Sequence, residues 1–376
     1  MMKYTYDNIP TPCFVVEEDL LEKNLKILRN VMDRTGCHIL LAQKCFSMFY
    51  TYPLIGKYLS GTTASGLYEA RLGKEYMGGE THVYSAAYRD DEIDEILEIC
   101  DHIVFNSQSQ WSRYKEKAIK AGKKYSLRIN PEYSTQEGHE IYDPCAKYSR
   151  MGITLDNFKK ADLDGISGLH FHTLCEQNSD DLLKTLEIIE EKFGYALYDM
   201  EWINFGGGHH ITREDYDIET LIKSIIHMKE KYNLEVYIEP GEAVALNAGY
   251  LVTTVLDIIE NERNIAILDT SAACHMPDVL EMPYTPLICD KTCDNNGIRY
   301  RLGGPTCLAG DIIGDYYFKE PLKVGDRLKF CDMAIYSMVK TNTFNGMKLP
   351  SIAYEKDGEI QIIKEFGYDD FKMRLS

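Results

Sequence analysis

Two charged residues stand at the ends of apolar, β-rich runs, where a protein could use them for chemistry. Lys44 closes the run that starts at residue 38, and Glu239 precedes Pro240-Gly241 at the end of another. A buried ammonium is costly without a partner, so Lys44 indicates an amine that attacks a carbonyl group. A carboxylate in the place of Glu239 can keep a pyridine nitrogen protonated. If each residue is considered alone, the alternative interpretation of Lys44 is a surface lysine, and that of Glu239 is a glutamate in a salt bridge.

Three consecutive glycines, Gly206-Gly207-Gly208, follow the β-rich residues 202–205. Backbone without side chains lets N–H groups close around an anion, which makes this segment a candidate phosphate loop. An ordinary flexible turn between a strand and a helix is the alternative. The spacing matches neither the P-loop nor the dinucleotide-binding fingerprint, so the sequence does not support nucleotide binding.

Two histidines, His170 and His172, alternate along one predicted strand, so both imidazoles face the same side. They form a possible metal pair to which His209-His210 could add ligands, and a barrel metal-hydrolase is therefore the rival enzyme class. Such a site needs further carboxylate or histidine ligands at neighbouring strand ends. Lys44 and Arg128 stand there instead and are not metal ligands, so we predict no metal.

The elements that would position these residues alternate between short β-rich runs and longer segments with helical periodicity. One helix is expected over residues 180–193 with Ser179 as its N-cap, and another over residues 215–232. Eight strands alternating with helices over about 240 residues match a parallel (β/α)8 barrel, with a doubly wound open sheet as the alternative. The predicted strands are residues 38–44, 62–66, 82–86, 102–106, 125–130, 166–173, 202–207 and 235–241.

The pattern changes after residue 245, where β-rich runs follow one another with few helical stretches between them. An Asp357-Gly358 turn flanked by two such runs is typical of a hairpin. We therefore expect an α/β fold in two domains, a barrel over residues 12–245 and an antiparallel β domain over residues 246–376 with 1–11. The strands expected in the second domain are residues 250–259, 265–269, 300–302, 327–336, 351–354 and 359–364.

The composition excludes several classes of protein. The chain has 41 Lys+Arg and 59 Asp+Glu, and the resulting formal charge of −18 argues against nucleic-acid binding. No apolar run approaches the roughly 18 residues of a membrane span, so we expect a soluble, cytoplasmic protein with no membrane partner. The odd number of cysteines, eleven, favours reduced thiols over a disulfide framework. Cys289 and Cys293 are accordingly expected to be plain thiols.

Motifs that follow one another along nearly the whole chain resemble those of the barrel-type pyridoxal-phosphate decarboxylases, which act on ornithine, arginine and diaminopimelate. Each motif alone is weak, but their shared order is specific. The resemblance implies pyridoxal 5'-phosphate as the cofactor. The motifs are Ala42-Gln43-Lys44-Cys45, Ala64-Ser65 with Glu69, Leu127-Arg128-Ile129-Asn130, Ser149-Arg150-Met151-Gly152, His172, Gly206–Gly208, Glu239-Pro240-Gly241, Gly304-Pro305-Thr306-Cys307 and Tyr336.

The resemblance also implies a role for each residue. Lys44 would bind the cofactor covalently, His172 would stack on its ring, and Glu239 would contact its pyridine nitrogen. Cys307 would enter the active site from a partner subunit and protonate the α-carbon, so a homodimer with shared active sites is implied. Among the remaining residues, the three glycines and Tyr336 would contact the phosphate of the cofactor. The remaining residues that would contact the cofactor are Ser65, Arg128, Gly206, Gly207, Gly208 and Tyr336.

Departures from the family pattern bear on the substrate. Glu242 stands where the family usually has a phosphate-binding arginine, and Leu308 follows Cys307 where ornithine and diaminopimelate enzymes carry an acid. Together with residues 269–284, these features resemble the carboxynorspermidine/carboxyspermidine branch, whose products are polyamines. We expect carboxylates to bind the ammonium groups of such a substrate and Leu308 to suit its methylenes. The candidate substrate residues are Glu242, Asp269, His275, Asp278, Glu281, Leu308 and Asp311.

Three alternatives stay open within the same fold. Glu242 and Leu308 disfavour a diaminopimelate decarboxylase, and Glu239 disfavours a racemase, since the family's racemases generally place an arginine at the pyridine nitrogen. A catalytically inactive regulator is disfavoured because both Lys44 and Cys307 are present.

Overall fold

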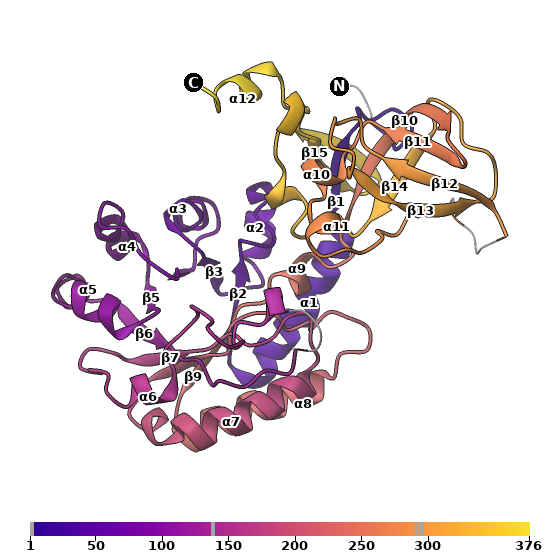
Figure 1. Ribbon diagram of the computed structural model, residues 1–376. Coiled ribbons are helices and arrows are strands. Elements are labelled where there is room, and N and C mark those ends of the chain that lie inside the picture. Colours follow the sequence, from indigo (N-terminus) through magenta and orange to yellow (C-terminus); the bar gives the residue numbers. More distant parts are fainter. Residues whose placement is uncertain (1–3, 137–139, 290–291, 293–295) are drawn as a thin grey trace. The chain divides into compact units, whose positions relative to one another are not determined.

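The chain folds into two compact units, which are described one after the other (Figure 1). The structure, a computed structural model, describes residues 4–136, 140–289, 292 and 296–376. One unit is Glu22–Val244, and the other combines Met1–Leu21 with Ala245–Ser376.

The first unit contains a closed barrel of eight strands, each paired in parallel with the next. The barrel closes where β2 pairs with β9, through His38 opposite Tyr237 and Ile39 opposite Ile238. The predicted (β/α)8 barrel is therefore confirmed. The strands are β2 (His38–Ala42), β3 (Gly61–Ala64), β4 (Glu80–Tyr84), β5 (His102–Phe105), β6 (Lys124–Arg128), β7 (Gly168–His170), β8 (Trp202–Asn204) and β9 (Glu235–Ile238).

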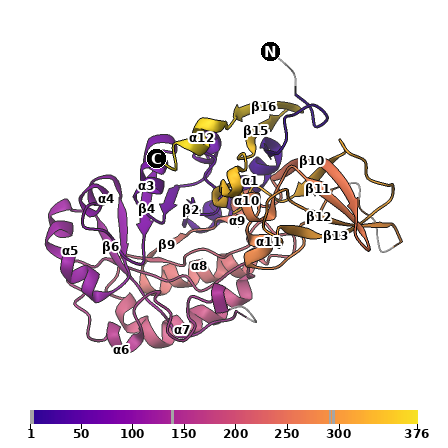
Figure 2. The same cartoon turned by 45° about the horizontal axis from the view of Figure 1, so that its top comes forward.

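Helices cover the outside of these strands, as Figures 1 and 2 show for α3, α4, α5, α7 and α8. Asp217 caps α8 by accepting a hydrogen bond from the Thr220 N–H. Asn178 caps α7, so Ser179 is its first residue rather than its cap, because the Asn178 amide oxygen accepts from the Ser179 N–H. The helices up to residue 245 are α1 (Glu18–Thr35), η1 (Phe49–Thr51), α2 (Tyr52–Ile55), α3 (Leu67–Tyr76), α4 (Ile93–Ile99), α5 (Gln108–Ala121), η2 (Glu140–Tyr142), α6 (Leu155–Phe158), α7 (Ser179–Leu197), α8 (Ile218–Tyr232) and α9 (Glu242–Ala245).

Stacked rings fill the barrel interior toward the N-terminal ends of its strands. The His82 and His102 rings stack with their centroids 4.0 Å apart. Trp202 lies 4.6 Å from the His102 ring, and Tyr237 lies 4.9 Å from the His82 ring. His82 Nε2 donates a hydrogen bond of 2.8 Å to the Glu80 carboxylate. This end of a barrel contributes mainly to stability, so we interpret the stack as part of the core.

Acid is expected to destabilise the barrel through His102. Burial, with smaller effects of His82, Lys124 and His38, lowers the pKa of His102 to about 2. Since an unfolded histidine titrates near about pH 6.5, the unfolded chain binds a proton below that pH that the folded chain does not. The free energy of unfolding should then fall by about 1.4 kcal/mol for each pH unit below about 6.5. Denaturant titrations between about pH 6 and pH 4 should show a shallower decline for His102→Phe, and equal slopes would contradict this.

The second unit is a mixed, mostly antiparallel sheet, which confirms the predicted β domain. Its strands run in the order β13-β12-β11-β10-β1-β15-β16, and β14 pairs with β10. Two pairs are parallel, β1 with β15 and β11 with β12. The strands are β1 (Cys13–Glu17), β10 (Gly249–Glu260), β11 (Asn264–Leu268), β12 (Ile298–Gly303), β13 (Ile312–Phe318), β14 (Arg327–Cys331), β15 (Ser351–Lys356) and β16 (Glu359–Lys364).

Strand β1, which the sequence pattern does not predict, joins the N-terminal residues to this sheet. It lies between β10 and β15, with Phe14 opposite both Leu251 and Ile352. Residues up to Leu21 therefore belong with the sheet rather than with the barrel. The short helices of this unit are α10 (Ala272–His275), α11 (Asp278–Glu281), η3 (Met338–Lys340), η4 (Phe344–Gly346) and α12 (Tyr368–Lys372).

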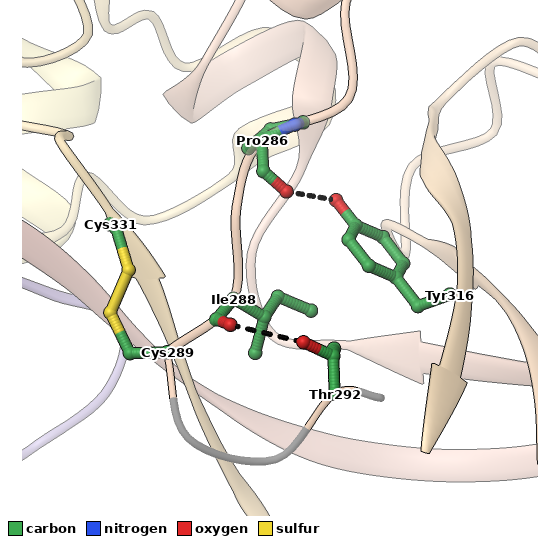
Figure 3. Close-up of a disulfide and its surroundings, with 6 residues drawn as sticks. All are labelled: Pro286, Ile288, Cys289, Thr292, Tyr316 and Cys331. Atoms are coloured by element: carbon green, nitrogen blue, oxygen red, sulfur yellow. Dashed lines mark hydrogen bonds between the residues drawn. A yellow bond between two sulfur atoms is a disulfide. The ribbon is translucent and has the colours of Figure 1, made fainter. Parts of the chain in front are cut away.

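Cys289 and Cys331 form a disulfide in the sheet unit (Figure 3). Their Cα atoms are 6.1 Å apart, within the usual range for such a bridge. The prediction that Cys289 is a plain thiol is therefore wrong. Backbone pairing of Ile288 with Phe330 of β14 brings the two cysteines together, and a sequence separation of 42 residues hides that pairing. Cys293 lies outside the described residues.

None of the helices in the described part of the chain is long and apolar enough to cross a membrane.

Candidate active site

The predicted cofactor residues of the barrel lie at the C-terminal ends of its strands. Because all eight strands are parallel, these ends meet at one rim, which is where barrel enzymes place their reactive groups. The residues are Lys44 after β2, Ser65 after β3, Arg128 at the end of β6, His172 after β7, Gly206, Gly207 and Gly208 after β8, and Glu239 after β9.

Glu239 is a buried carboxylate held by two hydrogen-bond donors. Asn204 Nδ2 donates to one carboxylate oxygen at 2.7 Å, and His170 Nε2 donates to the other at 3.2 Å. Burial alone would raise the pKa of Glu239, but its interactions with His170 and the Asn204 amide lower that pKa to about 2. The carboxylate is therefore ionised at neutral pH and oriented, so it can hold a proton on a neighbouring basic nitrogen.

His172 presents a neutral imidazole at the same rim. The Gly207 N–H donates to His172 Nδ1 at 3.1 Å, and Arg128 donates to the His172 carbonyl oxygen at 3.0 Å. Burial, followed by the charges of Lys44 and Arg128, lowers the pKa of His172 well below its ordinary value. A neutral ring whose Nδ1 accepts a hydrogen bond suits a flat stacking surface.

The two histidines of the β7 segment do not form a metal pair. His170 Nε2 is bound to Glu239, whereas His172 Nδ1 is bound to the backbone of Gly207. One ring nitrogen of each histidine thus has its own partner in the barrel, and this geometry disfavours the metal-hydrolase alternative.

The three glycines pack too tightly for any side chain. A Cβ at Gly206 would come within 2.4 Å of the Phe171 carbonyl oxygen, and one at Gly208 within 2.0 Å of the Leu174 carbonyl oxygen. Two of their N–H groups already have partners inside the protein, since Gly206 donates to Asn204 Oδ1 and Gly207 donates to His172 Nδ1. The role of the three glycines in phosphate binding stays a prediction, and the structure places side-chain acceptors at the N–H groups of the first two.

Replacing Gly208 with alanine is expected to weaken anion binding strongly. The residue has φ +82°, a conformation that alanine rarely adopts, and the new Cβ would collide with backbone. We expect cofactor affinity to fall by at least about tenfold, which corresponds to about 1.4 kcal/mol. Fluorescence titration of cofactor-free protein with pyridoxal phosphate would measure this. As a control, Gly66→Ala adds a Cβ with no atom within 4 Å, and a loss of the same size there would contradict the prediction.

Lys44 and Ser65 are exposed in the single chain. The Ser65 N–H donates to the Glu69 carboxylate at 2.6 Å, which explains why these two residues occur together in one motif. The exposed position of Lys44 leaves its amine accessible to a cofactor that enters from the rim.

Tyr84, His170 and Asn204 support the site, and the sequence analysis did not assign them this role. The Arg128 guanidinium lies 4.6 Å from the Tyr84 ring, and that ring stacks on His170 with centroids 5.5 Å apart. These contacts link Arg128 to the partner of Glu239. The missed residues are the last residues of β4, β7 and β8, so an inspection of every strand end would have found them.

Glu242, at the start of α9, faces His210. Its carboxylate oxygen lies 3.0 Å from His210 Nε2, and both side chains are largely buried. This acidic residue has a partner within the barrel unit, whereas the family's arginine would contact phosphate directly.

In the sheet unit, three of the candidate substrate residues have structural partners. Asp269 accepts from the Thr253 hydroxyl at 2.6 Å. His275 is fully buried, and its two ring nitrogens bond to Thr270 and to the Lys348 carbonyl oxygen. One carboxylate oxygen of Asp269 and both ring nitrogens of His275 thus have partners within the sheet unit, and the substrate role of these two residues stays a prediction.

Asp311 likewise holds the chain in place. It is 3% exposed and accepts hydrogen bonds from the Thr306 hydroxyl at 2.7 Å and from the Ala273 N–H at 3.2 Å. Both of its carboxylate oxygens therefore bind within the sheet unit, and the substrate role of Asp311 stays a prediction.

Asp278 and Glu281 share one cation. Lys340 donates to both carboxylates, to Glu281 at 2.9 Å. Burial alone would lower the pKa of Lys340, but these two hydrogen bonds raise it. Cys307 and Leu308 are exposed, and Tyr336 is half-buried after β14 with φ +53°. The sequence-predicted residues of the barrel therefore lie at one rim of the barrel, and the other candidate residues lie in the sheet unit.

Comparison with known proteins agrees with this chemistry. A model of the family described as "Pyridoxal-dependent decarboxylase, C-terminal sheet domain" matches residues 4–334. The chain belongs to this family. This membership confirms both the resemblance inferred from the motifs and pyridoxal phosphate as the cofactor of this decarboxylase.

Several relatives are similar to this decarboxylase over almost their whole length. The carboxynorspermidine/carboxyspermidine decarboxylase of Campylobacter jejuni is 45% identical over 98% of this chain and 99% of its own. The carboxyaminopropylagmatine decarboxylase of Synechocystis sp. is 44% identical over 98% of this chain and 96% of its own. The crystal structure of carboxynorspermidine decarboxylase from C. jejuni, complexed with norspermidine, has a TM-score of 0.91 at 44% identity and covers 97% of this chain and 100% of that one.

The barrel of this decarboxylase fits its cofactor. The glycine loop leaves no room for side chains, and a buried, ionised Glu239 suits a protonated pyridine nitrogen. Lys44 supplies an accessible amine on the same rim. Asn204 and His170 compensate the burial of this carboxylate and keep it charged, so the donor set agrees with the family's cofactor.

Proposed function

We propose that this decarboxylase converts carboxynorspermidine and carboxyspermidine to norspermidine and spermidine. The observation that carries the proposal is the 45% identity to the C. jejuni enzyme of that name over nearly both full lengths. Leu308 supports it, because an apolar residue after Cys307 suits a methylene chain where related enzymes carry an acid. We also propose small-molecule substrates of this kind as the only partners, apart from a second copy of the chain.

The chain's own residues divide the work as follows. Pyridoxal phosphate, when bound, supplies a sink for the electron pair that CO₂ leaves behind. Lys44 holds the cofactor covalently, and the ionised Glu239 keeps the proton on its ring nitrogen. The neutral His172 covers a ring face, and Gly208 with Ser65, Arg128 and Tyr336 completes the cofactor contacts. Cys307 of a second subunit donates a proton to the α-carbon, so that an amine is released.

The substrate's tail carries ammonium groups, and we assign them to Asp278 and Glu281. Both carboxylates bind Lys340, and the Glu281 side chain remains 55% exposed beside this contact, which supports Glu281 as a group that a substrate ammonium can reach. Glu281→Gln should therefore raise the KM for carboxynorspermidine by about tenfold and leave kcat nearly unchanged. A change confined to kcat would contradict this assignment. Glu242, paired with His210, is the remaining acidic candidate.

A second candidate substrate is carboxyaminopropylagmatine, because the Synechocystis relative is 44% identical over 98% of this chain. The test is CO₂ release by the purified enzyme from this compound, carboxynorspermidine, carboxyspermidine, meso-diaminopimelate and ornithine. We expect kcat/KM for the two carboxylated triamines to exceed that for ornithine and diaminopimelate by at least about 100-fold. A higher value for carboxyaminopropylagmatine would overturn the first proposal in favour of the second.

We further propose a homodimer whose active sites each use residues of both subunits. Lys44→Ala should then be nearly inactive alone, and Cys307→Ala should form very little of the amine product. Mixing equal amounts and allowing subunit exchange should restore about a quarter of the wild-type rate of amine formation, since half of the dimers are hybrids and each hybrid has one native site. No recovery, despite hybrid dimers seen by native mass spectrometry, would contradict shared sites.

A cytoplasmic location is also proposed. Eight cysteines in the described part of the chain are free thiols and two form the Cys289–Cys331 disulfide, and this excess of free thiols is typical of proteins in reducing compartments. Fractionation of producing cells should place the protein with cytoplasmic markers, and recovery in an extracytoplasmic fraction would contradict this.

A further inference from the structure

The loop that carries Cys307 closes on itself before β13. The Gly304 N–H donates to the Asp311 carbonyl oxygen at 3.0 Å, and the Asp311 N–H donates to the Leu308 carbonyl oxygen at 2.9 Å. The Thr306 hydroxyl adds a hydrogen bond of 2.7 Å to the Asp311 carboxylate. The base of the loop is thus fixed, while Cys307 itself is exposed near its tip.

A side chain from a different segment holds the tip of this loop. The Cys307 N–H donates to Asn345 Oδ1 at 2.8 Å, across a separation of 38 residues. Asn345 has φ +58°, in the left-handed region that asparagine tolerates better than most residues other than glycine. Asparagine at position 345 therefore meets two requirements: it tolerates the left-handed backbone conformation, and its side chain supplies an acceptor for the Cys307 N–H.

The segment around Asn345 is itself anchored on helix α10. The Asn342 N–H donates to the Cys274 carbonyl oxygen at 2.9 Å, and Asn342 Nδ2 donates to the Ala273 carbonyl oxygen at 2.8 Å. His275 Nε2 donates to the Lys348 carbonyl oxygen at 3.1 Å. The Ala273 N–H also donates to Asp311 at the base of the Cys307 loop. Helix α10 therefore contacts both the base of this loop and the segment that holds its tip.

We propose that Asn345 is a positioning residue for Cys307: its amide oxygen fixes the backbone of the loop so that the thiol proton reaches the α-carbon. This inference rests on the proposed function, in which Cys307 is the proton donor. The buried α10 contacts give Asn345 a rigid base, and rigid support is what a proton donor on an exposed loop requires.

The step has two possible outcomes. When Cys307 donates, a C–H bond forms at the α-carbon, the sulfur keeps the S–H electron pair as a thiolate, and water returns the proton. When the thiol is displaced, the α-carbon would not receive this proton. Water would then hydrolyse the substrate's carbon–nitrogen bond, so that the carbon skeleton leaves as an aldehyde while the bound cofactor, protonated from water, keeps the amino group. The ratio of amine to aldehyde therefore reports the position of Cys307.

Two substitutions at position 345 distinguish the effect of the Asn345 amide oxygen from the effect of its left-handed backbone conformation. Asn345→Gly keeps the positive φ and removes the acceptor, whereas Asn345→Asp keeps an acceptor and tolerates the same φ. We expect the aldehyde share of product to rise by about tenfold in the glycine variant, since a misplacement of about 1 Å can cost far more. In the aspartate variant it should stay within about twofold of wild type.

A second measurement needs no cofactor. In the cofactor-free protein, hydrogen exchange of the peptide that contains the Cys307 amide should be faster in Asn345→Gly than in wild type and near wild type in Asn345→Asp. Wild-type product ratio and wild-type exchange in the glycine variant would overturn the proposal. Equal defects in both variants would also overturn it, because the acceptor would then not be the property that matters.

The Cys307→Ala variant separates this inference from the proposed function. If Cys307→Ala raises the aldehyde share and Asn345→Gly does not, the positioning role fails while the role of Cys307 stands. If Cys307→Ala leaves the product ratio unchanged, the proposed role of Cys307 fails, and with it the catalytic consequence assigned to Asn345.

Discussion

Lys44→Ala protein is expected to purify folded but to lose decarboxylation by more than about a thousandfold, because Lys44 supplies the amine that holds the cofactor covalently in the proposed function. Lys44 follows β2 and is exposed at the rim that also carries His172 and Glu239. The visible absorbance band of the lysine-bound cofactor should be absent. Borohydride treatment and mass spectrometry should attach cofactor to the wild-type peptide that contains Lys44 and to no peptide of the variant.

The matched control is Lys57→Ala, which removes another exposed lysine of the same unit. It should retain wild-type activity and wild-type borohydride labelling. Covalent labelling of a different lysine in wild-type protein would contradict the assignment of Lys44, and so would a Lys44→Ala variant that keeps more than about a tenth of wild-type activity.

Glu239→Gln is expected to lower kcat by about 10²–10⁴-fold while cofactor binding persists. An amide cannot hold a proton on the cofactor's ring nitrogen, so the ring becomes a weaker electron sink. Asn204 and His170 would still have a side chain of the same shape to contact. Stopped-flow measurement of CO₂ release, with cofactor content determined in the same samples, would separate a loss of chemistry from a loss of cofactor.

The pH dependence sharpens this prediction. The pKa of Glu239 is lowered to about 2, so the group is ionised throughout the range of about pH 5–9. The ratio of wild-type to variant kcat should therefore be nearly constant over that range. As a control, Glu235→Gln changes a carboxylate at the opposite end of β9 and should have no such effect on kcat. A ratio that falls steeply toward acid would show that Glu239 titrates and would contradict the mechanism.

The barrel could be predicted from the sequence because its pattern is local. Each strand is a short run bounded by turn residues, and all eight predicted runs overlap the observed strands β2–β9. The strand-end rule then placed Lys44, Arg128, His172 and Glu239 without any knowledge of the fold. By contrast, β1 was missed because its five residues become a strand only by pairing with β10 and β15, which lie far away in the chain.

The candidate site was predicted less completely than the barrel. The sequence shows which side chains could react but not which polar atoms the fold has already used. Gly206 and Gly207 illustrate this, since their N–H groups bind the side chains of Asn204 and His172. Asp311 is a second case, because its carboxylate holds the Cys307 loop.

The amino-acid sequence by itself determined the (β/α)8 barrel, the β domain after it, the reactive lysine, the glycine loop and the family. These features depend on residue type and short-range spacing, which a single chain displays directly. Only the tertiary structure decided that His170 and Asn204 keep Glu239 ionised, that Cys289 pairs with Cys331, and that Asn345 holds Cys307. The physical reason is that hydrogen bonds and disulfides act over a few ångströms, whereas the residues that form these contacts lie 35 to 69 positions apart in the sequence.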